Sequence, residues 1–223
     1  MKRWSYEEAK GPLDRRYRPA DSVAETVADV IEAVRHRGDV ALIELAEQFD
    51  RVRFTSGEQM VVSEAEWAAA MGSVSEKEKD AIRLSRENVT SFAKQSLRED
   101  WMKANAQGVE VGERFLPFER VGIYVPGGSA PLVSTVNMTV AIAKAAGCPE
   151  IVVCTPPQAD GSVNPAMLYA LKEAGATEVY KVGGAQAIAA MAFGTSTISS
   201  VLKIYGPGNA YVMEAKRQCF GAV

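Results

Sequence analysis

The sequence is poor in the side chains from which metal sites and nucleophilic centres are built. Its 223 residues include one histidine, His36, and three cysteines, Cys148, Cys154 and Cys219. The cysteines form neither a paired framework nor a C-x-x-C motif, which indicates a reducing compartment. Zinc needs several converging nitrogen, sulfur or carboxylate ligands. We therefore predict a solvated surface role for His36, packing roles for the cysteines, and no catalytic or metal-binding residue in this stretch.

Runs of basic residues and long apolar runs are also missing. The net charge of −3 comes from 25 basic and 28 acidic residues scattered along the chain, without a basic stripe that would attract nucleic acid or an anionic membrane. No segment reaches the apolar length of a membrane span, and no apolar run follows the first positive charges as in a signal peptide. We expect a soluble cytoplasmic protein whose partners are small molecules or other subunits, with no nucleic acid and no membrane.

The first hundred residues carry a helical pattern. Apolar residues recur at the spacing of one helical face over 22–37, where Ser22 and Glu25 resemble a capping box, and a second helix follows to about residue 50 with Asp39 as its cap. A short strand is predicted over 60–62. Further capping boxes at Ser63 and Ser75 begin two helices, the second of which reaches about residue 95.

Residues 101–117 predict a β-hairpin, and from residue 120 onward short apolar strands alternate with helices. The expected strands cover 121–125, 151–155, 178–182 and 201–205, and helices are expected between them, the first over 134–147. This alternation is typical of βαβ units. We predict an α/β fold: a Rossmann-like doubly wound parallel sheet preceded by a mostly helical N-terminal region with a β-hairpin linker. The expected domains are 1–118 and 119–223, the second incomplete because the chain ends on an apolar segment.

Three of the expected strands lead into glycine-containing loops, which bring backbone close to a ligand in the crevice of an open parallel sheet. An aromatic residue or an amide stands beside each loop: Tyr124, Gln186 and Asn209. These groups suit a neutral, hydrogen-bonding ligand such as a nucleotide base and ribose, and none of them is an acid or base. Glycine in any one loop also has a purely conformational explanation. Neither G-x-G-x-x-G nor G-x-x-x-x-G-K-[ST] occurs, so no tight pyrophosphate clamp is indicated.

The same loops carry a resemblance to a known family. The runs RVGIYVPGGSAPLVSTV, EIVVCTPP, YKVGGAQAIAAMAFGT and KIYGPGNAYVMEAKRQCFG, with VRHRGDVALIELAEQFDRV upstream, closely resemble the histidinol dehydrogenases over about residues 22–223. The resemblance implies a zinc-dependent enzyme that oxidises L-histidinol to L-histidine in two NAD-linked steps through an aldehyde. It also implies that Tyr124, Gln186 and Asn209 contact NAD, and that the enzyme is a homodimer with intertwined subunits.

In that family the zinc ligands and the proton-transferring residues follow the GPGN helix, beyond the last residue of this sequence. We therefore expect the chain to represent the N-terminal half of a longer enzyme and to be inactive alone. Two alternatives stay open. One is a catalytically inactive module for dinucleotide binding or dimerisation. The other is a related dehydrogenase that acts on another alcohol, such as a sulfonated diol.

Overall fold

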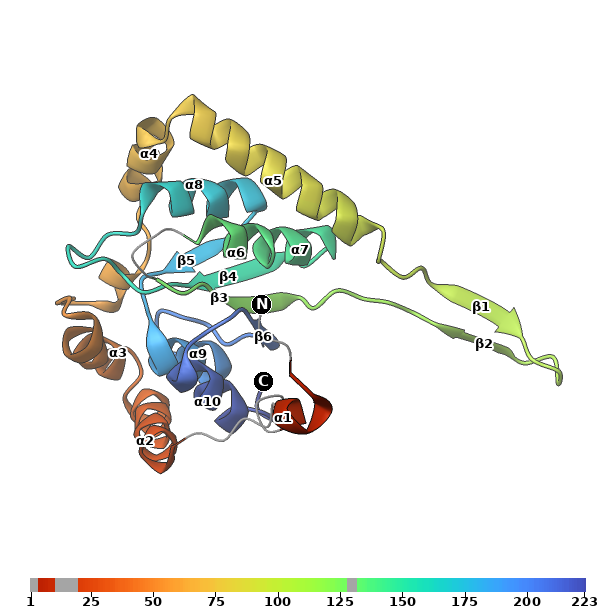
Figure 1. Cartoon of the computed structure of the whole chain (residues 1–223), viewed down its shortest axis with the longest axis horizontal. Helices are drawn as coiled ribbons and strands as arrows, with labels where there is room; N and C mark the ends of the chain where they lie inside the picture. Colours follow the sequence, from red (N-terminus) through yellow and green to blue (C-terminus); the bar gives the residue numbers. More distant parts are fainter. Residues whose placement is uncertain (1–3, 11–19, 128–131) are drawn as a thin grey trace.

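A parallel sheet of four short strands forms the centre of the protein (Figure 1). The computed structural model describes residues 4–10, 20–127 and 132–223. The strands are β3 (Arg120–Tyr124), β4 (Glu150–Cys154), β5 (Glu178–Tyr180) and β6 (Lys203–Tyr205), in the order β5-β4-β3-β6. The chain moves outward from β3 to β4 and β5 and then returns to the other side of β3 as β6. The strand order therefore reverses beside β3, at the position where open α/β sheets bind ligands.

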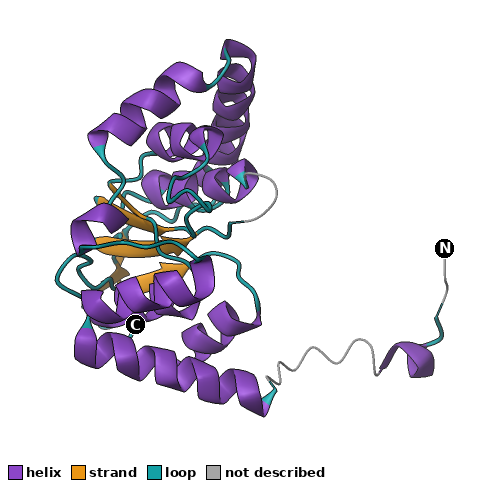
Figure 2. Cartoon of the chain, turned by 90° about the vertical axis from the view of Figure 1, so that its left-hand side faces the viewer, coloured by secondary structure: helices purple, strands orange, loops and turns teal. Residues whose placement is uncertain are grey.

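Helices cover both faces of the sheet, as Figure 2 shows. Two separate core clusters result, one on each face. The first lies among α2 (Asp21–Arg37), α3 (Asp39–Leu45), α9 (Gly184–Phe193) and α10 (Ala210–Gln218). The second lies among α4 (Glu64–Ser73), α5 (Glu76–Lys94), α6 (Val133–Asn137), α7 (Val140–Ala145) and α8 (Pro165–Ala174). The doubly wound α/β fold predicted from the sequence is confirmed. The predicted division at residue 118 stays a prediction.

The N-terminal helical hairpin forms as predicted, but two of its caps were assigned wrongly. Helix α2 begins at Asp21 with Ala20 as its N-cap, so Ser22 already lies in the first turn and makes no capping box. Helix α3 begins after Gly38, and no side chain caps it. Asp39 instead accepts hydrogen bonds from the hydroxyl and the backbone N–H of Thr197, at 2.7 and 3.3 Å. A tertiary contact thus replaces the expected local one.

A π-helical turn, η1 (Ala46–Asp50), continues α3 and brings Asp50 beside the sheet. The strand expected over 60–62 is wrong: residues Gly57–Met60 form a 3-10 helix, η2, and Val61 makes a single antiparallel bridge to Tyr180. Lys181 donates its backbone N–H to Met60 at 2.7 Å, so this segment closes the edge of β5. The capping boxes at Ser63 and Ser75 are both present.

The long helix expected over 134–147 is interrupted. It consists of α6 and α7, separated at Met138 and Thr139. The Thr139 hydroxyl donates to the carbonyl of Thr135 at 2.6 Å, a side-chain bond that competes with regular helical pairing and bends helices. Asn137, which is fully buried, donates to the Ser85 hydroxyl of α5 at 3.0 Å. The interruption therefore accompanies a polar contact that crosses from one helix to another.

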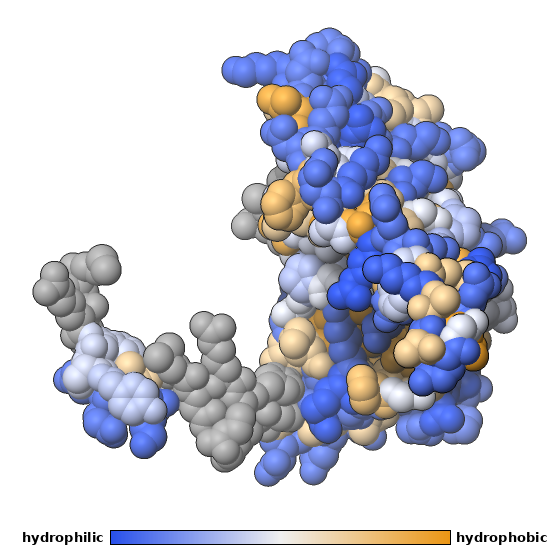
Figure 3. Space-filling view, turned by 90° about the vertical axis from the view of Figure 1, so that its right-hand side faces the viewer, coloured by the Kyte–Doolittle hydropathy of each residue, from blue (hydrophilic) through white to orange (hydrophobic). Residues whose placement is uncertain are grey.

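The predicted β-hairpin is present as β1 (Trp101–Ala104) and β2 (Glu110–Glu113), paired antiparallel, and it extends away from the sheet in Figure 1. All eight strand residues are exposed. Seen from that side, most of the described surface is hydrophilic, with apolar side chains between the polar ones (Figure 3). A short helix, α1 (Tyr6–Lys10), precedes the body. Among the described helices, none has the length and apolar character required to cross a membrane.

A candidate nucleotide cavity at the switch point of the sheet

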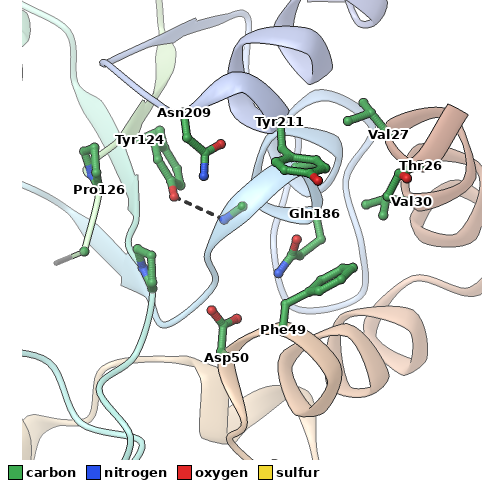
Figure 4. A pocket seen from close by; sticks show the side chains of 14 residues that line it. Thr26, Val27, Val30, Phe49, Asp50, Tyr124, Pro126, Gln186, Asn209 and Tyr211 are labelled. Atoms are coloured by element: carbon green, nitrogen blue, oxygen red, sulfur yellow. Dashed lines mark hydrogen bonds between the residues drawn. The ribbon is translucent and has the colours of Figure 1, made fainter. Parts of the chain in front are cut away.

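A cavity of about 480 Å³ opens at the carboxyl ends of the strands, beside the point where the strand order reverses (Figure 4). It brings together all three residues selected from the sequence: Tyr124 at the end of β3, Gln186 in the first turn of α9, and Asn209 at the start of α10. They lie 62 and 23 residues apart in the chain. The sheet topology alone makes them neighbours, as the rule for open α/β sheets predicts.

Tyr124 is fixed by its neighbours. Its side chain is 3% exposed, and its hydroxyl accepts a hydrogen bond of 3.1 Å from the backbone N–H of Gly184, the first residue of α9. Burial raises the pKa of Tyr124 to about 12. The phenol is therefore neutral near pH 7, and it keeps its own O–H proton as a donor after accepting from Gly184.

The glycine pair at the start of α9 makes room for the Gln186 amide. Gln186 is 2% exposed. Gly184 has φ +62°, and a Cβ at that position would lie 2.6 Å from the Gln186 side-chain oxygen. A Cβ at Gly183 would lie 2.9 Å from Pro156. The two glycines thus permit a close approach of the backbone, as predicted, but the groups that approach are side chains of the protein that line the cavity.

Asn209 also has a structural role that was not predicted from the sequence. It is the N-cap of α10, and its side-chain oxygen accepts a hydrogen bond of 3.1 Å from the backbone N–H of Val212. The amide nitrogen of Asn209 faces the cavity (Figure 4). The preceding loop is held closely, because a Cβ at Gly206 would lie 2.0 Å from the Tyr124 carbonyl oxygen. Lys216 of α10 donates to the carbonyl of Gly206.

The first glycine loop is only partly described. Pro126 and Gly127 line the cavity, and a Cβ at Gly127 would lie 3.2 Å from Pro156. Gly128, the third member of the predicted loop, lies outside the described residues.

The opposite wall of the cavity comes from the N-terminal helices. Helix α2 supplies Thr26, Val27 and Val30, and the π-helical turn supplies Phe49 and Asp50. The sequence pattern placed these residues in a separate helical region and indicated none of them as site residues. Their only local feature is an apolar stripe followed by a polar turn, a pattern common to amphipathic helices in general. Tyr211, two residues after Asn209, was also missed and lines the same cavity.

Asp50 carries the only formal charge among the described residues that line the cavity. Its oxygen Oδ2 is buried and has no hydrogen-bond partner among them. Burial raises the pKa of this carboxyl to about 6. In Figure 4 the carboxylate points toward the polar ends of Tyr124, Gln186 and Asn209. The cavity therefore combines an acceptor without a partner, neutral donors and the exposed aromatic rings of Phe49 and Tyr211.

The other groups considered from the sequence lie away from this cavity. His36 is on an exposed part of α2, 3.0 Å from Glu32. All three cysteines are buried, and burial raises the pKa of each thiol, most strongly for Cys154. These environments agree with the predicted surface and packing roles. Within 4–10, 20–127 and 132–223, no group of three or more His, Cys, Asp and Glu side chains could hold a metal ion.

Comparison with known proteins matches residues 13–223 to the family model described as histidinol dehydrogenase. The histidinol dehydrogenase of Synechococcus sp. is 46% identical over 198 residues, which cover 89% of this chain and 45% of that protein. The one from Xanthomonas euvesicatoria pv. vesicatoria is 44% identical over 219 residues, covering 96% and 50%. The chain thus spans about half the length of these relatives.

A solved structure gives the same correspondence. The crystal structure of histidinol dehydrogenase from Elizabethkingia anophelis superimposes with a TM-score of 0.89 at 38% sequence identity. The match covers 98% of this chain and 50% of that one. The similarity therefore includes the N-terminal helices and the hairpin as well as the sheet.

Proposed function

This chain belongs to the histidinol dehydrogenase family, and on that premise we propose that it carries the NAD-binding half of an enzyme that oxidises L-histidinol to L-histidine through an aldehyde. The observation that supports the proposal is the meeting of Tyr124, Gln186 and Asn209 in one cavity at the switch point of the sheet. Bound NAD supplies the hydride acceptor for both oxidation steps. This chain's residues bind and orient it.

The cavity suits the nucleoside part of a dinucleotide. The rings of Phe49 and Tyr211 offer apolar faces for a base, and the Tyr124 hydroxyl and the Asn209 amide nitrogen offer hydrogen-bond donors. The described lining contains no lysine or arginine, so it has no cation to neutralise a phosphate. A phosphate at this lining would depend on the backbone N–H groups at the N-termini of α9 and α10.

Zinc is part of the proposal for the whole enzyme, with ligands contributed by the half of the relatives' length that this chain does not span. The described residues do not fit the ion, since they bring together no set of metal-ligating side chains. The 223-residue chain is accordingly expected to show no oxidation of L-histidinol with NAD and zinc.

A homodimer is the proposed assembly. The hairpin supports it because every residue of both strands is exposed and several of them carry large apolar side chains. Among these are Trp101, Met102 and Val111, which are 42%, 66% and 46% exposed. Sedimentation velocity tests this part, and a monomer at all concentrations up to about 100 μM, far above the dissociation constant of a stable dimer, would contradict it.

The test of the main proposal is NAD binding by isothermal titration calorimetry, with Gln186→Met and Gln107→Met as a matched pair. Gln186 is buried at the cavity, whereas Gln107 lies exposed in the hairpin turn. We expect the wild-type chain to bind NAD, Gln186→Met to weaken binding about tenfold through the lost polar contact, and Gln107→Met to bind as the wild type does. Lack of binding by the wild type, or equal binding by both variants, would contradict the proposal.

A further inference from the structure

The carboxylate of Asp50 has an unusual environment for a folded protein, because one of its oxygens is buried without a partner in the described part of the chain. Its Oδ2 has neither solvent nor a hydrogen-bond partner among the described residues, and no ion pair accompanies the group there. Buried polar atoms are almost always hydrogen-bonded, and those that are not need an explanation. Because the side chain points into the cavity rather than into a core cluster (Figure 4), a ligand is the partner that the position admits.

The surroundings of Asp50 limit the kind of ligand group that it accepts. An acceptor without a partner requires hydroxyl or N–H donors. A phosphate cannot occupy the same position, because two anions in a poorly solvated site repel each other and no described lining residue is cationic. The group beside Asp50 is therefore a donor without negative charge.

The chemistry of the cavity also indicates which end of a dinucleotide lies in it. The described lining combines two aromatic rings, those of Phe49 and Tyr211, with the acceptor Asp50. The rings offer faces on which a purine base can stack, and an acceptor in the same lining suits the hydroxyls of the attached ribose. The adenosine end of the dinucleotide carries both groups.

We propose that Asp50 is a specificity-determining residue: its carboxylate accepts a hydrogen bond from the 2′-hydroxyl of the adenosine ribose and excludes a 2′-phosphate from that position. The proposal rests on the proposed function, because it takes the dinucleotide as the ligand. Asp50 stands on the π-helical turn of the N-terminal region and reaches the cavity opposite the glycine loops. The N-terminal region therefore takes part in the choice of cofactor.

The experiment is a thermodynamic cycle on the full 223-residue chain, measured by calorimetry. Wild type and Asp50→Asn are each titrated with NAD, with the analogue that lacks the 2′-hydroxyl on the adenosine ribose, and with NADP. Asp29→Asn is the matched control, because Asp29 is exposed on α2 and its substitution changes the net charge equally. Circular dichroism verifies that each variant is folded.

We expect removal of the 2′-hydroxyl to weaken wild-type binding about tenfold and to change the binding of Asp50→Asn less than twofold. NADP should bind wild type at least about tenfold more weakly than NAD. Asp50→Asn should reduce this ratio of the dissociation constants for NADP and NAD. Equal hydroxyl effects in wild type and Asp50→Asn would overturn the assignment of Asp50 while leaving the proposed function intact. Failure of the wild-type chain to bind NAD at all would overturn both.

Discussion

The partly buried carboxylate of Asp50, whose Oδ2 is fully buried, has a consequence for stability as well as for binding. Its pKa rises from an ordinary value of 3.8 to about 6, and burial is the cause. A carboxyl with a raised pKa holds its proton more tightly in the folded state than in the unfolded state. The folded state therefore loses stability as the pH rises through the interval between the two values, and the loss is complete above about 6. Below 3.8 this group has no effect.

The size of the effect follows from linkage. At about 1.36 kcal/mol for each pKa unit, ionised Asp50 lowers the free energy of unfolding by about 3 kcal/mol at pH 8 and by about 1 kcal/mol at pH 4.5. Asp50→Asn keeps the shape of the side chain and removes its charge. We therefore expect Asp50→Asn to raise the free energy of unfolding at both pH values. The gain over wild type should be about 2 kcal/mol larger at pH 8 than at pH 4.5.

Urea unfolding, followed by tryptophan fluorescence at the two pH values, measures the difference. Asp29→Asn serves again as the control, because this exposed residue of α2 lies outside the cavity lining. Its effect on the free energy of unfolding should be small and nearly the same at both pH values. A stability difference between Asp50→Asn and wild type that does not change with pH would refute the reasoning, since it would mean that Asp50 ionises equally in the folded and unfolded states.

Three further substitutions test contacts that hold the site and the sheet. Tyr124→Phe should cost about 1–2 kcal/mol in urea unfolding, because the first backbone N–H of α9 loses its partner. Gly206→Ala should cost on the order of 3 kcal/mol through collision with a carbonyl, against about 1 kcal/mol for Gly108→Ala, where φ is +82° and the space is open. Glu178→Gln should cost about 1–2 kcal/mol at pH 7. The cost should fall as the pH is lowered below the ordinary Glu value of 4.5, because hydrogen bonds from Arg120 lower the pKa of Glu178 and its contribution disappears as it is protonated.

Local patterns predicted the parts of the fold that depend on nearby residues. The apolar stripe of α2, the capping boxes at Ser63 and Ser75 and the hairpin around Gly108 all involve groups within a few turns of each other. The three cavity residues were predictable for the same reason, since each stands directly beside a strand end with a glycine loop. Parallel pairing then brings the strand ends to one edge of the sheet.

Two of the wrong predictions share a different cause. Asp39 has the local appearance of a cap, but Thr197, far along the chain, takes its carboxylate. Thr139 has the local appearance of a helical residue, but its hydroxyl binds the preceding turn while Asn137 reaches α5. In each case a polar side chain had two partners available, and only tertiary contacts decide between them. Local pattern contains no information about that choice.

Asp50 is the extreme case of this dependence on tertiary structure. In the sequence it is one acid at the end of an amphipathic helix, and such residues are normally solvated. It becomes a candidate binding residue only because α2 packs against α9 and α10. This packing brings the π-helical turn that carries Asp50 to the cavity. A structural role alone would favour asparagine here, since the charge costs about 3 kcal/mol at neutral pH. A buried carboxylate oxygen without a hydrogen-bond partner needs an explanation, and a donor on a ligand in the cavity supplies one.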